Sequence, residues 1–318
     1  MKDKLVTIAA CLIFLAGAAI FCYPLAMNWY YDYHTSHVLD SYKNEIKELS
    51  RQAAEKVQNI PETAVQASES QDMLDKLYEE MALYNQTIYE NRQKDLTDPF
   101  SYESAGFDLT AYGLSDNIIG YLTIPAMDVE LPIYLGANNE NMTKGAVHLG
   151  QTSMPVGGIN TNVVLAAHRG YQGIPMFREI EKLKIQDPVT ITTPWDTLTY
   201  QVTKTEIIFP DEINKILIQP DKDMLTLFTC HPYRENSHRY VVYCERTFPA
   251  TEASKTETAK EPSPEPDSTL QNQEATDSED SAYSSSMQQI LIDKYVPIAG
   301  IVFLVILFII CMSGLRKK

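Results

Sequence analysis

Basic residues are scarce in this chain of 318 residues: 26 lysines and arginines stand against 42 acidic residues, a formal net charge of -16. So acidic a chain binds phosphate polyanions poorly, which disfavours nucleic-acid recognition. Cysteines are also few. Three of the five lie in apolar runs (Cys11, Cys22 and Cys311), which excludes a scaffold built on disulfides. A single bond between the other two, Cys230 and Cys244, stays open as an alternative.

Motifs that hold a cofactor or a metal ion are missing as well. Gly157 and Gly158 predict a turn rather than a loop that cradles phosphate. His231 and His238 lack the paired spacing of a zinc site. We therefore expect no cofactor and no metal.

Long apolar runs are present at both ends of the chain. Residues 5–27 and 296–315 carry no charge, and each run is long enough to span a hydrocarbon core of about 30 Å as a helix. Basic residues flank the outer end of each run, in residues 1–4 and 316–318. The positive-inside rule then places both termini in the cytoplasm and the rest of the chain outside, at the cell membrane. A cleaved signal peptide is the alternative for the first run.

The region between the two runs changes composition along its length. Residues 28–95 have apolar side chains at helical spacing, interrupted at Pro61, which predicts two amphipathic helices. Residues 117–247 form short β-type runs separated by turn residues, which predicts a mainly β sandwich or barrel. Residues 248–290 are rich in Ser, Thr, Glu and Pro. Nine acidic and two basic residues in 251–290 give a net charge of -7, which predicts a disordered tether.

Eight strands and one helix are predicted within the β region. The helix is expected over 175–183, and the strands over 119–123, 129–134, 146–149, 162–167, 189–192, 198–208, 224–229 and 239–245.

Three residues in this region suit acyl transfer. Cys230 ends the apolar strand MLTLFTC and His168 ends the apolar strand TNVVLAAH. Arg239 opens the strand that follows the loop HPYRENSH. If all three meet at one rim, a thiolate attacks an amide carbon, an imidazolium protonates the departing amine, and a guanidinium stabilises the oxyanion. Taken singly, each residue has a structural interpretation, and Cys244 is expected to pack in the core because it points to the face opposite Arg239.

The segment TLFTCHPYRENSHRYVVYCER resembles the signature of class C, pilus-building sortases. The blocks LPIYLGA, GAVHLGQTSMPVGG, VVLAAHRG and MFREIEKL resemble the same family in the same order, over about residues 95–247. The resemblance implies an eight-stranded sortase β-barrel. It also implies that Cys230 is the nucleophile, His168 the general acid and base, and Arg239 the stabiliser of the oxyanion or substrate. Asn162 departs from the pattern, in which histidine is frequent at that position. The difference bears on substrate preference and does not touch the three chemical residues.

Class C members also carry a lid with a D-P-aromatic motif ahead of the barrel. Asp98, Pro99 and Phe100 match that motif, within a lid segment expected over 96–116. The resemblance implies that Asp98 pairs with Arg239 while Phe100 covers the thiol of Cys230. The lid would then close the site until substrate displaces it.

The resemblance implies a membrane-anchored transpeptidase on the outer face of a Gram-positive-type cell. It would cleave an LPxTG-like sorting signal between Thr and Gly and join pilin subunits through a lysine side chain. Its partners would be pilins or other surface proteins with such signals. Two alternatives stay open: a housekeeping-type sortase that anchors proteins to cell-wall peptide, and a non-enzymatic scaffold with a sortase-like barrel.

Overall fold

The computed structural model describes most of the chain. The described residues are 2–55, 64–94, 96, 107–171, 174–248, 288–292, 295–296, 298–306 and 308–309. Asp98, Pro99, Phe100 and most of the expected tether lie outside them.

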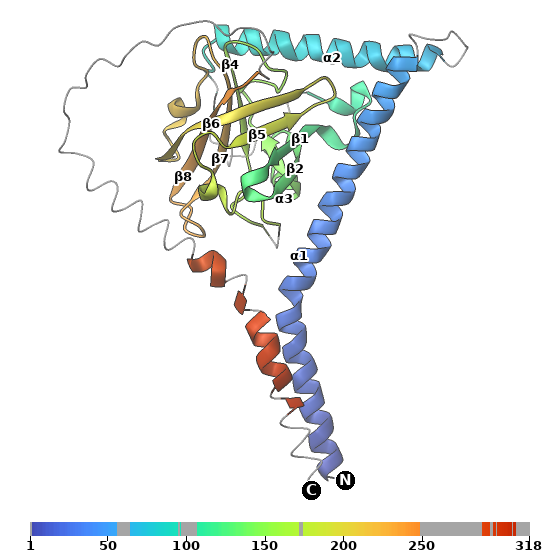
Figure 1. Ribbon diagram of the computed structural model, residues 1–318, viewed down its shortest axis with the longest axis vertical. Coiled ribbons are helices and arrows are strands. Elements are labelled where there is room, and N and C mark those ends of the chain that lie inside the picture. Colours follow the sequence, from blue (N-terminus) through green and yellow to red (C-terminus); the bar gives the residue numbers. More distant parts are fainter. Residues whose placement is uncertain are drawn as a thin grey trace, which may run out of the picture.

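Two long helices precede the barrel (Figure 1). Helix α1 (Lys2–Glu55) continues from the first apolar run into the polar segment. Helix α2 (Ala64–Glu90) follows. Within the described part of the chain, no single helix is both long and apolar enough to cross a membrane. Two stretches of α1, Cys11–Ile20 and Leu25–Glu48, meet that requirement only together, across a bend of 42°.

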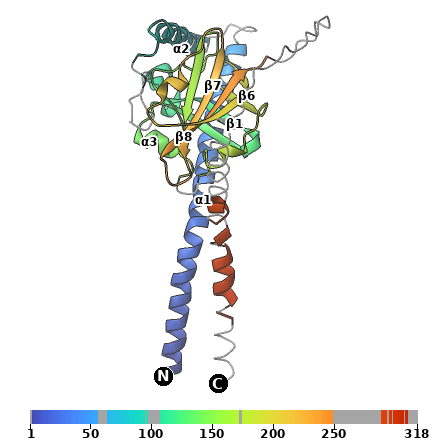
Figure 2. The same cartoon turned by 90° about the vertical axis from the view of Figure 1, so that its left-hand side faces the viewer.

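Helix α1 also contacts the helical residues near the C-terminus. The rings of Phe14 and Phe308 stack with centroids 4.3 Å apart. Gly17 leaves room for Leu304, whose Cδ1 would lie 3.3 Å from an added Cβ. Both views show these C-terminal residues running beside the N-terminal half of α1 (Figure 2).

Both helices are fastened to the barrel by buried polar contacts. In α1, the hydroxyl of Tyr42 donates to the carbonyl of Ile119 at 2.9 Å. In α2, one apolar stripe at helical spacing faces the barrel, and Leu77 and Met81 on it are fully buried. Asn85 continues this stripe, and its side-chain amide exchanges two hydrogen bonds with the backbone of Met154.

Eight strands form a closed barrel in the order β1-β2-β3-β4-β7-β8-β6-β5, which confirms the predicted eight-stranded fold. The strands are β1 (Ile118–Ile124), β2 (Val129–Leu135), β3 (Ala146–His148), β4 (Thr161–Ala166), β5 (Pro188–Thr192), β6 (Thr197–Ile208), β7 (Asp223–His231) and β8 (His238–Arg246). The pairs β2–β3 and β4–β7 are parallel and the others are antiparallel. Parallel neighbours need a crossover connection, and helix α3 (Asn139–Lys144) lies in the crossover between β2 and β3.

The predicted helix over 175–183 is wrong. The structure has turns there, followed by a short 3-10 helix at Ile180–Lys182. The amide of Phe177 donates to the carbonyl of His168 at 3.1 Å, and Met176 has a φ of 44°. A tertiary contact therefore takes the amide of Phe177, and several of the amides that follow bond to the carbonyl three residues back instead of four. So short a helix has little stability of its own.

The core is divided between the two faces of the strands. One apolar cluster takes residues from all eight strands and fills the barrel, with Leu225, Leu227 and Cys244 among its members. A second cluster lies on the outer face and includes Ala166 and Phe228. Alternation along a strand therefore assigns each neighbour of these residues to the interior or to the outer face.

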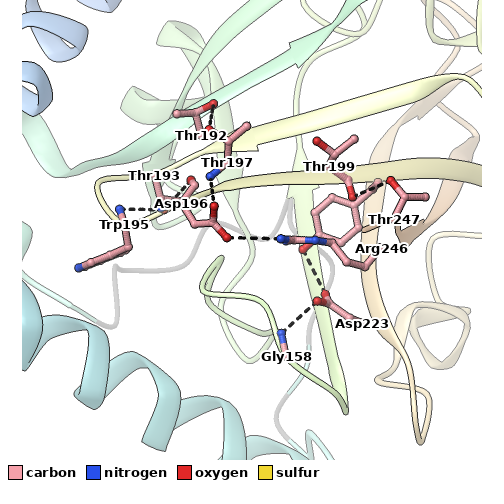
Figure 3. A network of polar contacts seen from close by, with 11 residues as sticks. Gly158, Thr192, Thr193, Trp195, Asp196, Thr197, Thr199, Asp223, Arg246 and Thr247 are labelled. Atoms are coloured by element: carbon pink, nitrogen blue, oxygen red, sulfur yellow. Dashed lines mark hydrogen bonds and ion pairs between the residues drawn. The ribbon is translucent and has the colours of Figure 1, made fainter. Parts of the chain in front are cut away.

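A polar network lies at the start of β7 and the end of β8 (Figure 3). Asp223 accepts hydrogen bonds from the amide of Gly158 at 3.0 Å and from the hydroxyl of Tyr200 at 3.2 Å. Arg246 forms an ion pair with Asp196 at 3.4 Å. This network closes the end of the barrel opposite Cys230, since Cys230 lies near the other end of β7.

Candidate active site

The pairing of three strands puts the predicted residues in one row. On β7 and β8, Cys230 and Arg239 are direct partners in an antiparallel register. On β4 and β7, Ala166 and Phe228 are partners in a parallel register. Continuing that register by two residues sets His168 beside Cys230. Side chains of paired residues share a face, so all three lie at one rim on the outer side of the barrel.

The thiol of Cys230 is half-buried at this rim, and both barrel cysteines are free, so the disulfide alternative is wrong. Cys244 is fully buried in the barrel interior, paired with Leu225 of β7. Burial raises the pKa of the Cys244 thiol well above its usual range. Of the two, Cys230 is therefore the thiol placed for chemistry, because only a thiolate is strongly nucleophilic.

His168 follows β4 and is half-buried. Burial lowers the pKa of its imidazole below the ordinary value, so the isolated ring is mostly neutral near pH 7. Its ring stacks on Tyr171, with centroids 5.0 Å apart and planes at 17°. Tyr171 also lines a cavity of about 270 Å³ between the barrel and α1, where Tyr30 and Tyr31 lie. The turn after the histidine needs glycine at position 170, where φ is 86° and an added Cβ would lie 3.3 Å from Arg178.

Arg239 is held close to the barrel and is only 8% exposed. Its Nη1 donates to the carbonyls of Asn236 and His238, each at 3.1 Å. The guanidinium is thus fixed at the entrance to β8, beside its strand partner Cys230. A fixed guanidinium next to a thiol can stabilise the oxyanion that forms when the thiolate attacks a carbonyl.

A buried charged cluster that the sequence did not predict lies behind this row. Arg169, Glu181 and His231 have side chains that are at most 4% exposed. Arg169 forms an ion pair with Glu181, and its Nη1 lies 2.7 Å from Nδ1 of His231. Arg169 and His231 directly follow His168 and Cys230 in the chain. This adjacency could have indicated that they lie near the site, although it says nothing about what they do. Nothing in the local sequence marks Glu181.

Among the described residues, no group of three or more His, Cys, Asp and Glu side chains is arranged to hold a metal ion. The two histidines that flank the loop after β7 have other contacts. Nδ1 of His231 faces Arg169, and Nδ1 of His238 lies 2.9 Å from the hydroxyl of Ser237. Asn162 is also structural: it is buried, and its amide donates to the carbonyl of Ile216 at 2.9 Å.

Comparisons with known proteins agree with this geometry. The sortase domain family model matches residues 122–247. Sortase D of Bacillus subtilis (strain 168) is 31% identical over 130 residues, which make up 40% of this chain and 63% of that protein. The chain therefore spans less than two thirds of that relative's length.

Solved structures extend the similarity beyond the barrel. Sortase C1 of GBS pilus island 1 is 28% identical with a TM-score of 0.54, over 70% of this chain and 96% of that chain. Sortase C of Streptococcus pneumoniae is 27% identical with a TM-score of 0.54, over 68% of this chain and 100% of that chain. Residues 122–247 therefore form a sortase domain, and class C pilus sortases are among the structural neighbours of the chain.

Proposed function

We propose that this protein cleaves an LPxTG-like sorting signal between Thr and Gly through a thioester on Cys230. The observation that carries the proposal is the row of His168, Cys230 and Arg239 across β4, β7 and β8. The thiol of Cys230 first gives its proton to the neutral ring of His168, which becomes the imidazolium. The thiolate then attacks the Thr carbonyl carbon, and Arg239 stabilises the oxyanion. The C–N bond to Gly then breaks, and the imidazolium of His168 gives its proton to the departing amine.

The acyl group then passes to an amine, which we propose is a lysine side chain of the next pilin. The amine attacks the thioester, its proton returns to His168, and the thiolate leaves. An isopeptide bond between two subunits results. The class C structural neighbours support this acceptor, since one of them belongs to a pilus island.

We also propose that the protein is anchored in the cell membrane with its barrel outside and both termini in the cytoplasm. The two apolar runs with basic outer flanks support this topology. Contacts such as Phe14 on Phe308 are consistent with two neighbouring spans. Protease added to intact cells should remove the barrel and spare tags fused to either end. Loss of either tag would contradict the topology.

A lid formed by Asp98, Pro99 and Phe100 is a further part of the proposal. Its first support is the D-P-aromatic motif. Its second is Leu96, which packs into the same outer cluster as Phe228, and Phe228 stands two residues before Cys230 in the chain. The double variant Asp98→Ala with Phe100→Ala should raise the rate of Cys230 alkylation. An unchanged rate would show that these residues do not cover the thiol.

The first test is the thioester itself. Full-length protein in detergent is incubated with an LPxTG-like peptide, and the adduct on Cys230 is measured by mass spectrometry. Cys230→Ala should abolish the adduct. Cys244→Ala is the matched control, because it removes the other barrel thiol, and it should form the adduct normally. Wild-type protein that forms no adduct with any LPxTG-like peptide would refute the proposed chemistry.

The second test identifies the acceptor. In the native host, Cys230→Ala should abolish pilin ladders, and mass spectrometry of wild-type products should show sorting-signal Thr joined to a pilin lysine. Thr joined to cell-wall peptide would instead indicate a housekeeping role. Ladders that persist in Cys230→Ala cells with no other sortase would remove the pilus assignment.

A further inference from the structure

The buried charged cluster of Arg169, Glu181 and His231 is not used by the mechanism above. It lies on the interior side of the strands that carry the catalytic row. Position 231 shares the interior face with Leu225 and Leu227, whereas Cys230 shares the outer face with Phe228. The cluster is therefore directly behind the reacting groups.

Arg169 connects the two strand ends that carry the thiol and the imidazole. It follows His168 in the chain, and its Nη1 lies 3.3 Å from the carbonyl oxygen of Cys230. One residue earlier on each strand, the hydroxyl of Thr229 donates to the carbonyl of Ala167 at 2.7 Å. The ends of β4 and β7 are thus joined by side chains just beyond their last paired residues, and the separation of His168 and Cys230 depends on these links.

The imidazole of His231 links the two charged side chains of the cluster. Its Nδ1 lies 2.7 Å from Nη1 of Arg169. Glu181 balances the charge of Arg169, and its Oε1 lies 3.2 Å from the same Nδ1. Loss of the carboxylate would leave a buried, unbalanced guanidinium beside the backbone of Cys230.

We propose that Arg169, Glu181 and His231 are positioning residues that hold Cys230 and His168 at the separation required for transpeptidation. They do not touch the substrate. The proposal rests on the proposed function, because it assumes that Cys230 and His168 carry the reaction.

A purely stabilising role fits the cluster less well. Buried ion pairs are expensive to desolvate, and well-packed apolar residues of similar volume often give equal or greater stability. The barrel interior around the cluster is apolar. The contact with the Cys230 carbonyl gives the charges a task that apolar side chains cannot perform, since only a donor can fix that carbonyl.

The experiment compares three variants of the full-length protein. Glu181→Gln removes the balancing charge. The double variant Arg169→Met with Glu181→Met removes the ion pair and keeps the volume. Asp223→Asn is the control, because it alters a half-buried, hydrogen-bonded carboxylate at the far end of β7. Thioester formation gives kcat and KM for an LPxTG-like peptide. Alkylation of Cys230 by iodoacetamide across pH gives a second readout that needs no substrate.

We expect kcat to fall about tenfold or more in Glu181→Gln and in the double variant, with KM within about threefold of wild type, because a displacement of about 1 Å costs about 100-fold in rate. The pH of half-maximal alkylation should rise in both variants, since the cluster no longer holds the imidazolium of His168 beside the thiolate of Cys230. Asp223→Asn should resemble wild type in both readouts.

Three outcomes would overturn the proposal. In the first, the Glu181→Gln variant and the double variant both fold and keep the kcat and the alkylation profile of the wild-type protein. Another is failure of the double variant to fold, which would assign the cluster to stability. The third is an equal loss of kcat in Asp223→Asn, which would show a general response to lost charge. Wild-type protein that is alkylated but forms no thioester would instead count against the proposed function.

Discussion

His148 should make the barrel sensitive to acid, independently of catalysis. It ends β3, is 1% exposed, and its Nε2 lies 2.9 Å from the carbonyl oxygen of Ser153. Burial lowers the pKa of this imidazole from 6.5 to about 4. In the unfolded chain the same ring takes up a proton near pH 6.5. Between these values the unfolded state binds more protons, so the free energy of unfolding falls as the pH is lowered.

The size of the effect follows from the two pKa values. At 1.36 kcal/mol per pH unit, acidification from pH 7.5 to pH 4 should cost about 3 kcal/mol from this residue alone. The full contribution is present above pH 6.5 and is lost as the pH approaches 4. A loss of this size is a large share of the 5–15 kcal/mol that stabilises typical domains, an order-of-magnitude range.

Urea unfolding measures the effect, with the fluorescence of Trp195 as the probe in a Trp29→Phe background. His148→Gln keeps a donor near the Nε2 position and cannot gain a proton, so it should lower stability somewhat at pH 7.5 and lose about 3 kcal/mol less than the parent by pH 4. Other acidic and histidine groups titrate equally in both proteins and cancel in the difference. Equal losses in the two proteins would refute the reasoning.

Three further variants test single contacts. Cys244→Ala should leave the alkylation rate of Cys230 within about twofold of wild type and lower the free energy of unfolding by about 1 kcal/mol, measured in urea. Thr229→Val should cost about 1–3 kcal/mol in the same assay, because it leaves the Ala167 carbonyl without its donor. Tyr42→Phe should cost about 1 kcal/mol, seen as roughly fivefold faster amide exchange in the adjacent turns of α1, since it removes a bond to β1. Unchanged exchange would mean that the helix docks through its apolar contacts alone.

The barrel was largely predictable because each of its strands has a local sequence pattern typical of a β-strand. Short β-type runs bounded by Gly, Pro and Asn gave all eight strands within about two residues of their observed ends. The segment over 175–183 misled because Phe177, Ile180 and Leu183 have helical spacing, yet they are buried by turns that pack against the barrel. Short amphipathic segments satisfy more than one local structure, and tertiary contacts decide between them.

The candidate site was predictable only in part, for a similar reason. His168 and Cys230 stood out as polar residues at the ends of apolar strands, and the parallel pairing of β4 and β7 accounts for their proximity. Their chemical roles stay predictions. Glu181 escaped notice because Arg169 lies at the other end of the connection between β4 and β5 and His231 lies on β7, so only the folded chain brings the three together.

The stretch of helix α1 after its bend sets a fixed distance between the first apolar run and the barrel. Residues 28 to 42 separate the apolar run from the Tyr42 contact with the barrel, and 15 residues at about 1.5 Å each give a rod of about 22 Å. The catalytic rim faces the end of that rod nearest the apolar run, since Tyr30 and Tyr31 share a cavity with Tyr171, which stacks on His168. Under the proposed topology, the thiol works at a fixed height above the bilayer, and the sorting signal of a membrane-held substrate must present its scissile bond at that height.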